Sequence, residues 1–134
     1  MDTSGWAYLF DRNSDFHHDV QAIYQHALAR NRLLVTTNYI LAELVALLSS
    51  RSRISREQIV ISIDALKATP HVEIIHIDTS LDATAWALLK TYIDKRWSLV
   101  DASSFVVMTS YGITEAITTD HHFTQAGFVR LPAQ

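Results

Sequence analysis

Short apolar segments alternate with amphipathic segments along this chain, and this alternation constrains its fold more than any other feature. Buried strands are predicted at residues 33–35, 72–77, 113–118 and 127–131, and helices at 5–10, 16–29, 39–50, 55–66, 79–93 and 98–112. Strands that alternate with helices are typical of a parallel sheet covered on both faces. The sequence therefore predicts an α/β fold.

The clearest helix start lies at Ser98 and Asp101. A serine followed three residues later by an acid is typical of a helix N-terminus, where the hydroxyl caps a free N–H and the acid favours the positive helix end. Phe105 and Val106 continue an apolar stripe, and Gly112 can end the helix in a left-handed conformation. Taken alone, Asp101 could be a capping acid and nothing more.

Length and composition favour one domain that spans residues 1–134. The chain is 49% hydrophobic and contains no cysteine, which excludes disulfides and thiolate zinc sites and favours a reducing cytoplasm. It has neither a signal peptide pattern nor an apolar run of the roughly 18 residues that span a membrane. The net charge of −3 means that any contact with a polyanion requires a local basic patch.

Four carboxylates occupy positions where a parallel sheet would bring them together. Asp2 precedes the first helix, Asp120 follows a strand, and Asp101 lies in a first helical turn. Glu43 is the only charged residue between positions 33 and 50. Ligands of open α/β sheets bind where strands end and helices begin. We therefore expect these four acids to reach one edge of the sheet.

Carboxylates that share a pocket repel one another, so they would partly protonate unless a cation opposes their charge. Hard oxygen ligands without cysteine select Mg²⁺ or Mn²⁺, and Ca²⁺ is possible on geometry alone. The four acids therefore predict a divalent metal site.

The same residues carry a resemblance that runs over essentially the whole chain. The segments at residues 1–6, 98–105 and 118–123, together with the helix that contains Glu43, are similar to the PIN domain, and most closely to its VapC-type toxin ribonucleases. The resemblance implies a three-layer α/β/α fold and a metal-dependent endoribonuclease with Asp2, Glu43, Asp101 and Asp120 as its acidic residues. It also implies homodimers and neutralisation by a cognate antitoxin protein.

The chemistry available to such a site is the hydrolysis of RNA phosphodiester bonds with Mg²⁺, or Mn²⁺ as a substitute. We predict Asp2 and Asp101 as direct metal ligands, whereas Glu43 and Asp120 could bind through water or a second ion. Three neighbouring hydroxyl residues could donate hydrogen bonds to these carboxylates or cap local turns: Thr3, Ser4 and Thr119.

Cations and aromatic rings near the acids are candidates for RNA contact. The predicted RNA-binding residues, which could equally lie in ordinary solvated loops, are Arg51, Arg53, Arg56, Lys95, Arg96 and His121. Three aromatic residues could stack on bases, but burial in the core is the expected role of Trp6, Trp97 and Phe123. Neighbouring histidines on a helix point about 100° apart, so we expect the remaining histidines to lie on the surface.

Three other functions fit parts of the pattern. A phosphoaspartate phosphatase would require a second Asp where this chain has Ser4, and a receiver domain would require a late Lys that we do not find. A catalytically degenerate PIN domain that only binds a protein or RNA complex is the stronger alternative. Against it stands the retention of all four acids, because like charges without a function destabilise a fold.

Overall fold

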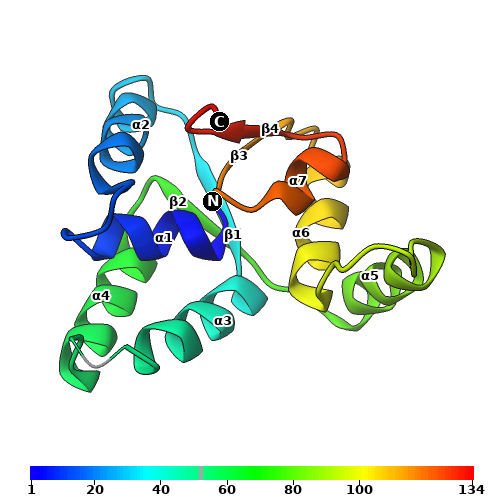
Figure 1. Ribbon diagram of the computed structural model, residues 1–134, viewed down its shortest axis with the longest axis horizontal. Helices are drawn as coiled ribbons and strands as arrows, with labels where there is room; N and C mark the ends of the chain where they lie inside the picture. The colour runs from blue at the N-terminus through cyan, green and yellow to red at the C-terminus, as the bar shows by residue number, and fades with distance from the viewer. Residues whose placement is uncertain (52) are drawn as a thin grey trace.

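The computed structural model describes residues 1–51 and 53–134 and arranges them as helices around two pairs of strands (Figure 1). The helices are α1 (Thr3–Phe10), α2 (His17–Ala29), α3 (Asn38–Ser49), α4 (Arg56–Ala68), α5 (Thr79–Thr91), α6 (Leu99–Ser110) and α7 (His121–Gln125). The strands are β1 (Leu34–Thr37), β2 (Val72–Ile75), β3 (Glu115–Ile117) and β4 (Val129–Leu131). No helix in the described part of the chain is long and apolar enough to span a membrane.

The strands form two parallel pairs, and the N-terminus lies between them. β1 pairs with β2, and β3 pairs with β4, both in parallel. The Met1 ammonium donates to the Val35 carbonyl at 2.6 Å, and the Asp2 N–H donates to the Ile117 carbonyl at 3.1 Å. Figure 1 shows the N-terminus between β1 and β3. Residues 1–2 therefore connect the β1/β2 pair with the β3/β4 pair at one point.

Helices cover both faces of β3. Ala116 packs in a core cluster with Phe105 of α6, whereas Ile117 packs in a second cluster with Val20 and Ala27 of α2. Successive residues of a strand point to opposite faces of the sheet. The strands therefore lie between two helical layers, which confirms the three-layer α/β/α fold with parallel strands.

Local capping signals account for most helix starts. Thr37 accepts from the Ile40 N–H at 3.1 Å and begins α3. Ser55 and Gln58 form the reciprocal capping box that begins α4. α5 begins at Thr79, as predicted, and the Asp78 carboxylate caps it by accepting from the Leu81 N–H. An ionised side chain is a better acceptor for a free N–H than a hydroxyl.

The close approach of α1 to β3 sets the position of Asp2. A Cβ atom on Gly5 would lie only 2.5 Å from the Ile117 carbonyl oxygen, so a larger residue would push the helix away. Trp6 is 1% exposed, and its Nε1 donates to the Thr36 hydroxyl at 3.1 Å. These contacts hold the first turn of α1 against the ends of β1 and β3.

Candidate active site

Asp2 lies at the N-cap of α1 and is buried. Its Oδ2 accepts a hydrogen bond from the Thr118 hydroxyl at 2.8 Å. Burial raises the pKa of Asp2 to about 6, the hydrogen bond from Thr118 opposes this rise, and the charge of Asp101 adds to it. Asp2 is thus close enough to Asp101 for their charges to interact.

Asp101 lies in the first turn of α6, as the sequence predicts. The Ser98 hydroxyl accepts from the Asp101 N–H, and Asp101 Oδ2 accepts from the Ser98 N–H, both at 3.0 Å. The same Oδ2 lies 3.0 Å from Nδ1 of His122. Asp101 therefore caps its helix and also faces a side chain from a distant part of the sequence.

Asp120 follows β3 and begins α7. Its N–H donates to the Thr118 hydroxyl at 3.0 Å, and its Oδ1 accepts from the His122 N–H at 2.9 Å. The Thr118 hydroxyl therefore connects Asp120 with Asp2. Nδ1 of His122 lies 3.2 Å from Asp120 Oδ1, so its ring stands between Asp101 and Asp120.

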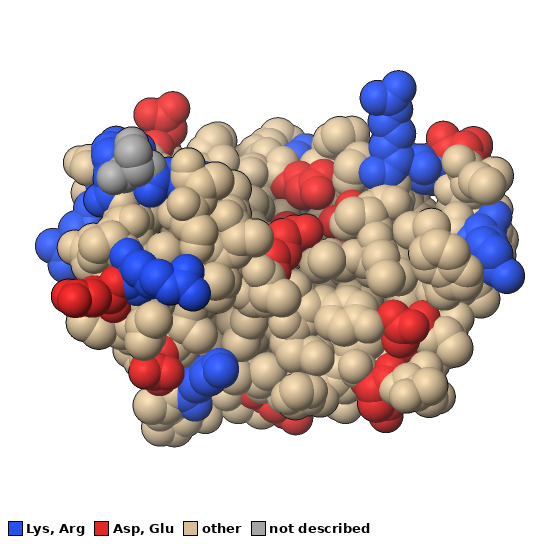
Figure 2. Space-filling view, turned by 90° about the horizontal axis from the view of Figure 1, so that it is seen from below, with Lys and Arg blue, Asp and Glu red and all other residues tan. Residues whose placement is uncertain are grey.

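Glu43 joins this group from α3. Its Oε1 accepts a hydrogen bond from the Thr3 hydroxyl at 2.5 Å, next to Asp2 in the chain. α3 also contacts α6, the helix that carries Asp101. Figure 2 shows acidic side chains at the bottom of a hollow in the middle of one face of the molecule. The structure therefore brings the four acids to one region.

The structure corrects the expectation that His122 is a surface residue. Its side chain is 18% exposed and contacts both Asp101 and Asp120. His121 is mostly exposed, and its Nδ1 lies 3.7 Å from Asp120 Oδ1. One potential ligand atom from each of Asp120, His121 and His122 lies within 4.8 Å of the others. The adjacency of His121 and His122 does not indicate this contact, because Asp101 lies 21 positions away from His122 in the chain.

The hydroxyl residues form a network that differs in part from the prediction. Ser4 Oγ lies 3.5 Å from Asp2 Oδ2 and 3.0 Å from the Thr118 hydroxyl. The Thr119 hydroxyl donates to the Tyr8 hydroxyl at 3.4 Å rather than to a carboxylate. Thr118, which the prediction omitted, is 1% exposed and makes the contacts expected of Thr119. Successive side chains alternate in direction at a strand end, so only one of the two threonines can face the acids.

The basic residues divide into two groups. Arg51 and Arg53 each lie 3.3 Å from Asp11, at the opposite end of α1 from Asp2 and roughly 12 Å along the helix. The expectation that Arg51 and Arg53 border the acidic site is therefore wrong, because Asp11 binds both elsewhere; Arg56 is exposed at the start of α4, and its contact with RNA stays a prediction. The second group comprises Lys95 and Arg96, which are exposed and shortly precede the start of α6.

The three aromatic residues are core residues, as expected. Trp6, Trp97 and Phe123 are 1%, 8% and 1% exposed. Nε1 of Trp97 donates to Gln125 at 3.0 Å, which ties the start of α6 to α7. These rings stabilise the elements that carry the acids and are not free to stack on bases.

No Lys or Arg side chain in the described part of the chain forms an ion pair with the four acids, whose basic side-chain contacts there are the rings of His121 and His122. The ion pairs that Lys and Arg form there involve Asp11, Asp94 and Glu115, none of which belongs to the site. The nearby Met1 ammonium is buried, which lowers its pKa to about 6 and weakens it as a cation at neutral pH. Four carboxylates are hard oxygen donors, and their negative charge is not offset by a lysine or arginine in the described part of the chain. Such a group fits a divalent cation.

This fold and this acidic group define the class of protein. The PIN domain family model matches residues 1–129, and the chain belongs to that family. The 23S rRNA-specific endonuclease VapC20 of Mycobacterium tuberculosis, known from two strains, is 29% identical over 131 residues, which cover 98% of this chain and 95% of the relative. The crystal structure of M. tuberculosis VapC20, described as a sarcin-ricin loop cleaving toxin, superimposes with a TM-score of 0.83 at 30% identity, over 96% of this chain and 94% of that one. The resemblance to VapC-type ribonucleases is confirmed.

Proposed function

We propose that this protein is a metal-dependent endoribonuclease that uses Asp2, Glu43, Asp101 and Asp120 to hydrolyse RNA phosphodiester bonds. The observation that carries the proposal is the convergence of these four acids on one region through Thr3, Thr118 and His122. Membership in the PIN family and the likeness to an endonuclease support it.

The acids would hold Mg²⁺ or Mn²⁺, which supplies charge neutralisation for the phosphate and activation of water. Asp2 and Asp101 are the proposed direct ligands, because both are buried and their charges interact. Glu43 and Asp120 complete the group and orient water or a second ion. The hydrogen bond from Thr3 fixes one oxygen of Glu43, and the hydrogen bond from Thr118 fixes one oxygen of Asp2.

The RNA would enter over the exposed residues near the site. Lys95 and Arg96 lie close to the start of α6, and His121 lies beside Asp120. Positive side chains there would offset the repulsion between the RNA phosphates and the carboxylates. Since the relatives are named for cleavage of 23S rRNA, we propose a structured ribosomal RNA loop as the substrate.

We further propose that the protein is a cytoplasmic toxin of a type II toxin–antitoxin pair. The description of the relative as a toxin supports this role. A cognate antitoxin would then cover the acidic hollow, and the toxin would form a homodimer. Co-expression with the protein encoded in the neighbouring reading frame, followed by size-exclusion chromatography with light scattering, tests both assemblies.

The decisive experiment compares RNA cleavage by the parent and by Asp101→Asn. The asparagine can still accept from the Ser98 N–H, so the cap of α6 is retained while the charge is removed. With Mg²⁺ or Mn²⁺, the parent should cleave RNA and release 23S fragments from ribosomes, and Asp101→Asn should be inactive. Asp64→Asn, an exposed position on α4, is the matched control and should keep full activity. Equal activity of the parent and Asp101→Asn would refute the proposal.

A catalytically degenerate PIN domain is the second candidate, and the site does not favour it. Such a domain would have no reason to keep a buried Asp2 whose pKa is raised to about 6. If the parent fails to cleave RNA under any metal condition yet still binds it, that second function would replace the first.

A further inference from the structure

One face of α1 leads away from the acids toward Tyr8, a residue that the proposed function does not use. Ser4 Oγ lies 3.5 Å from Asp2 Oδ2 and accepts from the Thr119 N–H at 3.1 Å. Tyr8 follows Ser4 by four residues, so both side chains lie on the same face of α1, about 6 Å apart along the helix axis. The Tyr8 hydroxyl accepts from the Thr119 hydroxyl, and Thr119 directly precedes Asp120. Tyr8 therefore lies beside the loop that carries Asp120.

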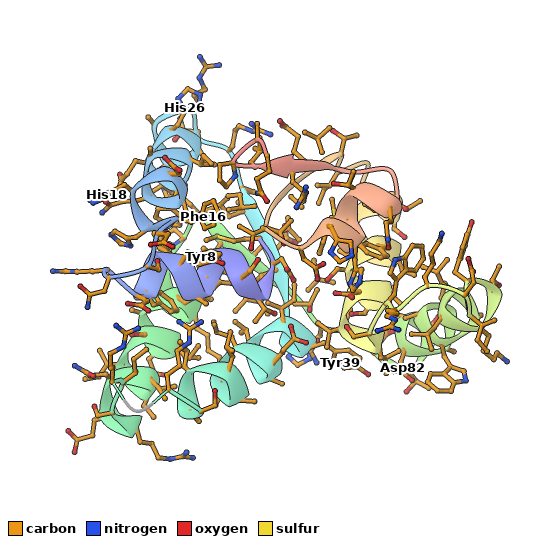
Figure 3. All side chains as sticks on the ribbon, viewed as in Figure 1. Tyr8, Phe16, His18, His26, Tyr39 and Asp82 are labelled. Carbon is orange, nitrogen blue, oxygen red and sulfur yellow. The ribbon has the colours of Figure 1, made fainter. Side chains whose placement is uncertain are left out.

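The ring of Tyr8 is fixed by its neighbours without being enclosed in the core. Tyr8 is half-buried, whereas Trp6 on the same helix is 1% exposed. The Tyr8 ring lies 5.2 Å from the ring of Phe16, and Figure 3 shows the two residues next to one another where α1 meets α2. The Tyr8 carbonyl lies 2.8 Å from Nδ1 of His17. A fixed aromatic ring loses little conformational entropy when a flat base stacks on it.

Arg130 contacts the same loop from β4. Its Nη1 donates to the Thr119 carbonyl at 2.9 Å and to the Gln134 side chain at 3.0 Å, which uses both N–H groups of that nitrogen. Its Nε and Nη2 donate to no acceptor among the described residues, and it forms no ion pair with a carboxylate there. The guanidinium is therefore held by one nitrogen, and its Nε–Nη2 edge stays free.

This free edge of Arg130 has the geometry of a phosphate-binding group. The parallel N–H groups of a guanidinium edge match two oxygens of one phosphate in a bidentate pair. Arg51 and Arg53 differ from Arg130 in this respect, because both are paired with Asp11. The Tyr8 ring and the Arg130 edge meet at Thr119. An aromatic ring and a guanidinium edge on one loop match the two parts of a nucleotide, which are a flat base and a phosphate.

Tyr8 and Arg130 also extend the proposed RNA path beyond the acids. Lys95 and Arg96 precede α6, whereas Tyr8 lies on α1. Figure 1 shows α6 and α1 on opposite sides of the N-terminus, where Asp2 lies. An RNA strand that crosses the acids from the side of α6 would therefore next reach the face of α1 that carries Tyr8.

We propose that Tyr8 and Arg130 bind one nucleotide of the RNA beside the scissile phosphate, with the base stacked on the Tyr8 ring and a phosphate bound to the Nε–Nη2 edge of Arg130. We call this pair the nucleotide subsite. The inference rests on the proposed function, because it takes RNA as the ligand. Every base has a flat face that can stack, so the subsite positions the strand and does not read its sequence.

The first experiment tests the base contact by the binding of a short single-stranded RNA, measured by fluorescence anisotropy in EDTA. One residue of the RNA at a time is made abasic. Loss of the base at one position should weaken binding to the parent about tenfold. Tyr8→Leu keeps an apolar side chain without the ring, so it should bind the intact RNA about tenfold more weakly and lose the dependence on that position. Tyr8→Phe keeps the ring and should match the parent.

The second experiment tests the phosphate contact by a salt titration of the same binding. Arg130→Gln removes one phosphate contact, so it should reduce the slope of log K against log salt concentration by about 0.7. Arg130→Lys keeps the charge and should keep the slope, but it should bind more weakly than the parent because it loses the bidentate edge. Lys67→Gln removes an exposed charge on α4 and is the matched control, which should change neither the affinity nor the slope.

Three results would overturn the inference: no RNA binding by the parent in EDTA, an abasic profile of the parent without a preferred position, or an unchanged salt slope for Arg130→Gln. The abasic profile of the parent needs no substitution, so it does not depend on the folding of Tyr8→Leu. Binding in EDTA is independent of cleavage. A parent that binds as expected but fails to cleave RNA with metal would therefore refute the proposed function and leave the nucleotide subsite in place.

Discussion

Replacement of Asp2 by Asn should stabilise the fold at neutral pH while it abolishes the proposed activity. Asp2 is 6% exposed, and an asparagine of the same shape can still accept from the Thr118 hydroxyl. The substitution therefore removes a buried charge and leaves the packing and the main hydrogen bond in place.

The size of the effect follows from the pKa of Asp2, which burial raises from 3.8 to about 6. One pKa unit corresponds to about 1.4 kcal/mol, so ionisation of Asp2 costs the native state about 3 kcal/mol. Because the pKa is higher in the folded state, the native protein binds the proton more tightly. The contribution of Asp2 to stability is thus fully present below pH 3.8 and is lost as the pH rises through about 6.

Urea unfolding of the parent and Asp2→Asn between pH 4 and pH 8, without divalent cations, measures this difference. The variant should be more stable by about 3 kcal/mol at pH 7.5, and the gain should shrink toward zero at pH 4. Asp64→Asn removes an exposed charge and should show no such pH dependence. A gain that is the same at pH 4 and pH 7.5, or a loss at pH 7.5, would refute the reasoning.

Three further experiments test the metal site and the contacts that position the acids. Mn²⁺ should raise the Tm of the parent, and the double variant Glu43→Gln/Asp101→Asn should lose this shift in a thermal scan. Thr118→Val removes a buried hydroxyl that serves Asp2 and the α7 cap, and urea titration should show a loss of about 1–3 kcal/mol; Thr118→Ser, which keeps the hydroxyl, should lose less. Gly5→Ala places a Cβ 2.5 Å from a β3 carbonyl and should cost about 1–3 kcal/mol by the same assay, and an unchanged midpoint would show that α1 can shift freely.

The starts and ends of several helices were predictable, because capping signals lie within a few residues of them in the sequence. The capping boxes at Ser55 and Ser98 begin α4 and α6 where the sequence indicates, and Gly112 follows α6 with a φ of 67°. These signals act over three or four residues, so they do not depend on the tertiary fold. The parallel arrangement of the strands followed from their alternation with helices.

The side-chain partners of the acids were less predictable, because they depend on contacts between distant segments. His122 reaches Asp101 across 21 positions, and Thr118 reaches Asp2 across 116. No sequence spacing encodes such distances in the chain. Arg51 and Arg53 show the same limit, since their pairing with Asp11 spans about 40 residues and removes them from the predicted substrate path.

The position of two of the acids at helix N-termini helps to explain how the fold tolerates the repulsion between the carboxylates. Asp2 occupies the N-cap position of α1 without a side-chain capping hydrogen bond, and Asp101 lies in the first turn of α6, so each lies at the positive end of a helix of eight or more residues. This interaction is typically worth up to about 1 kcal/mol each and is fixed by the fold, unlike a mobile lysine. It offsets only part of the cost of burying Asp2, whose pKa stays raised at about 6. The remaining negative charge of the four acids favours the binding of a divalent cation over a monovalent one. This preference exists in the free protein, without bound RNA.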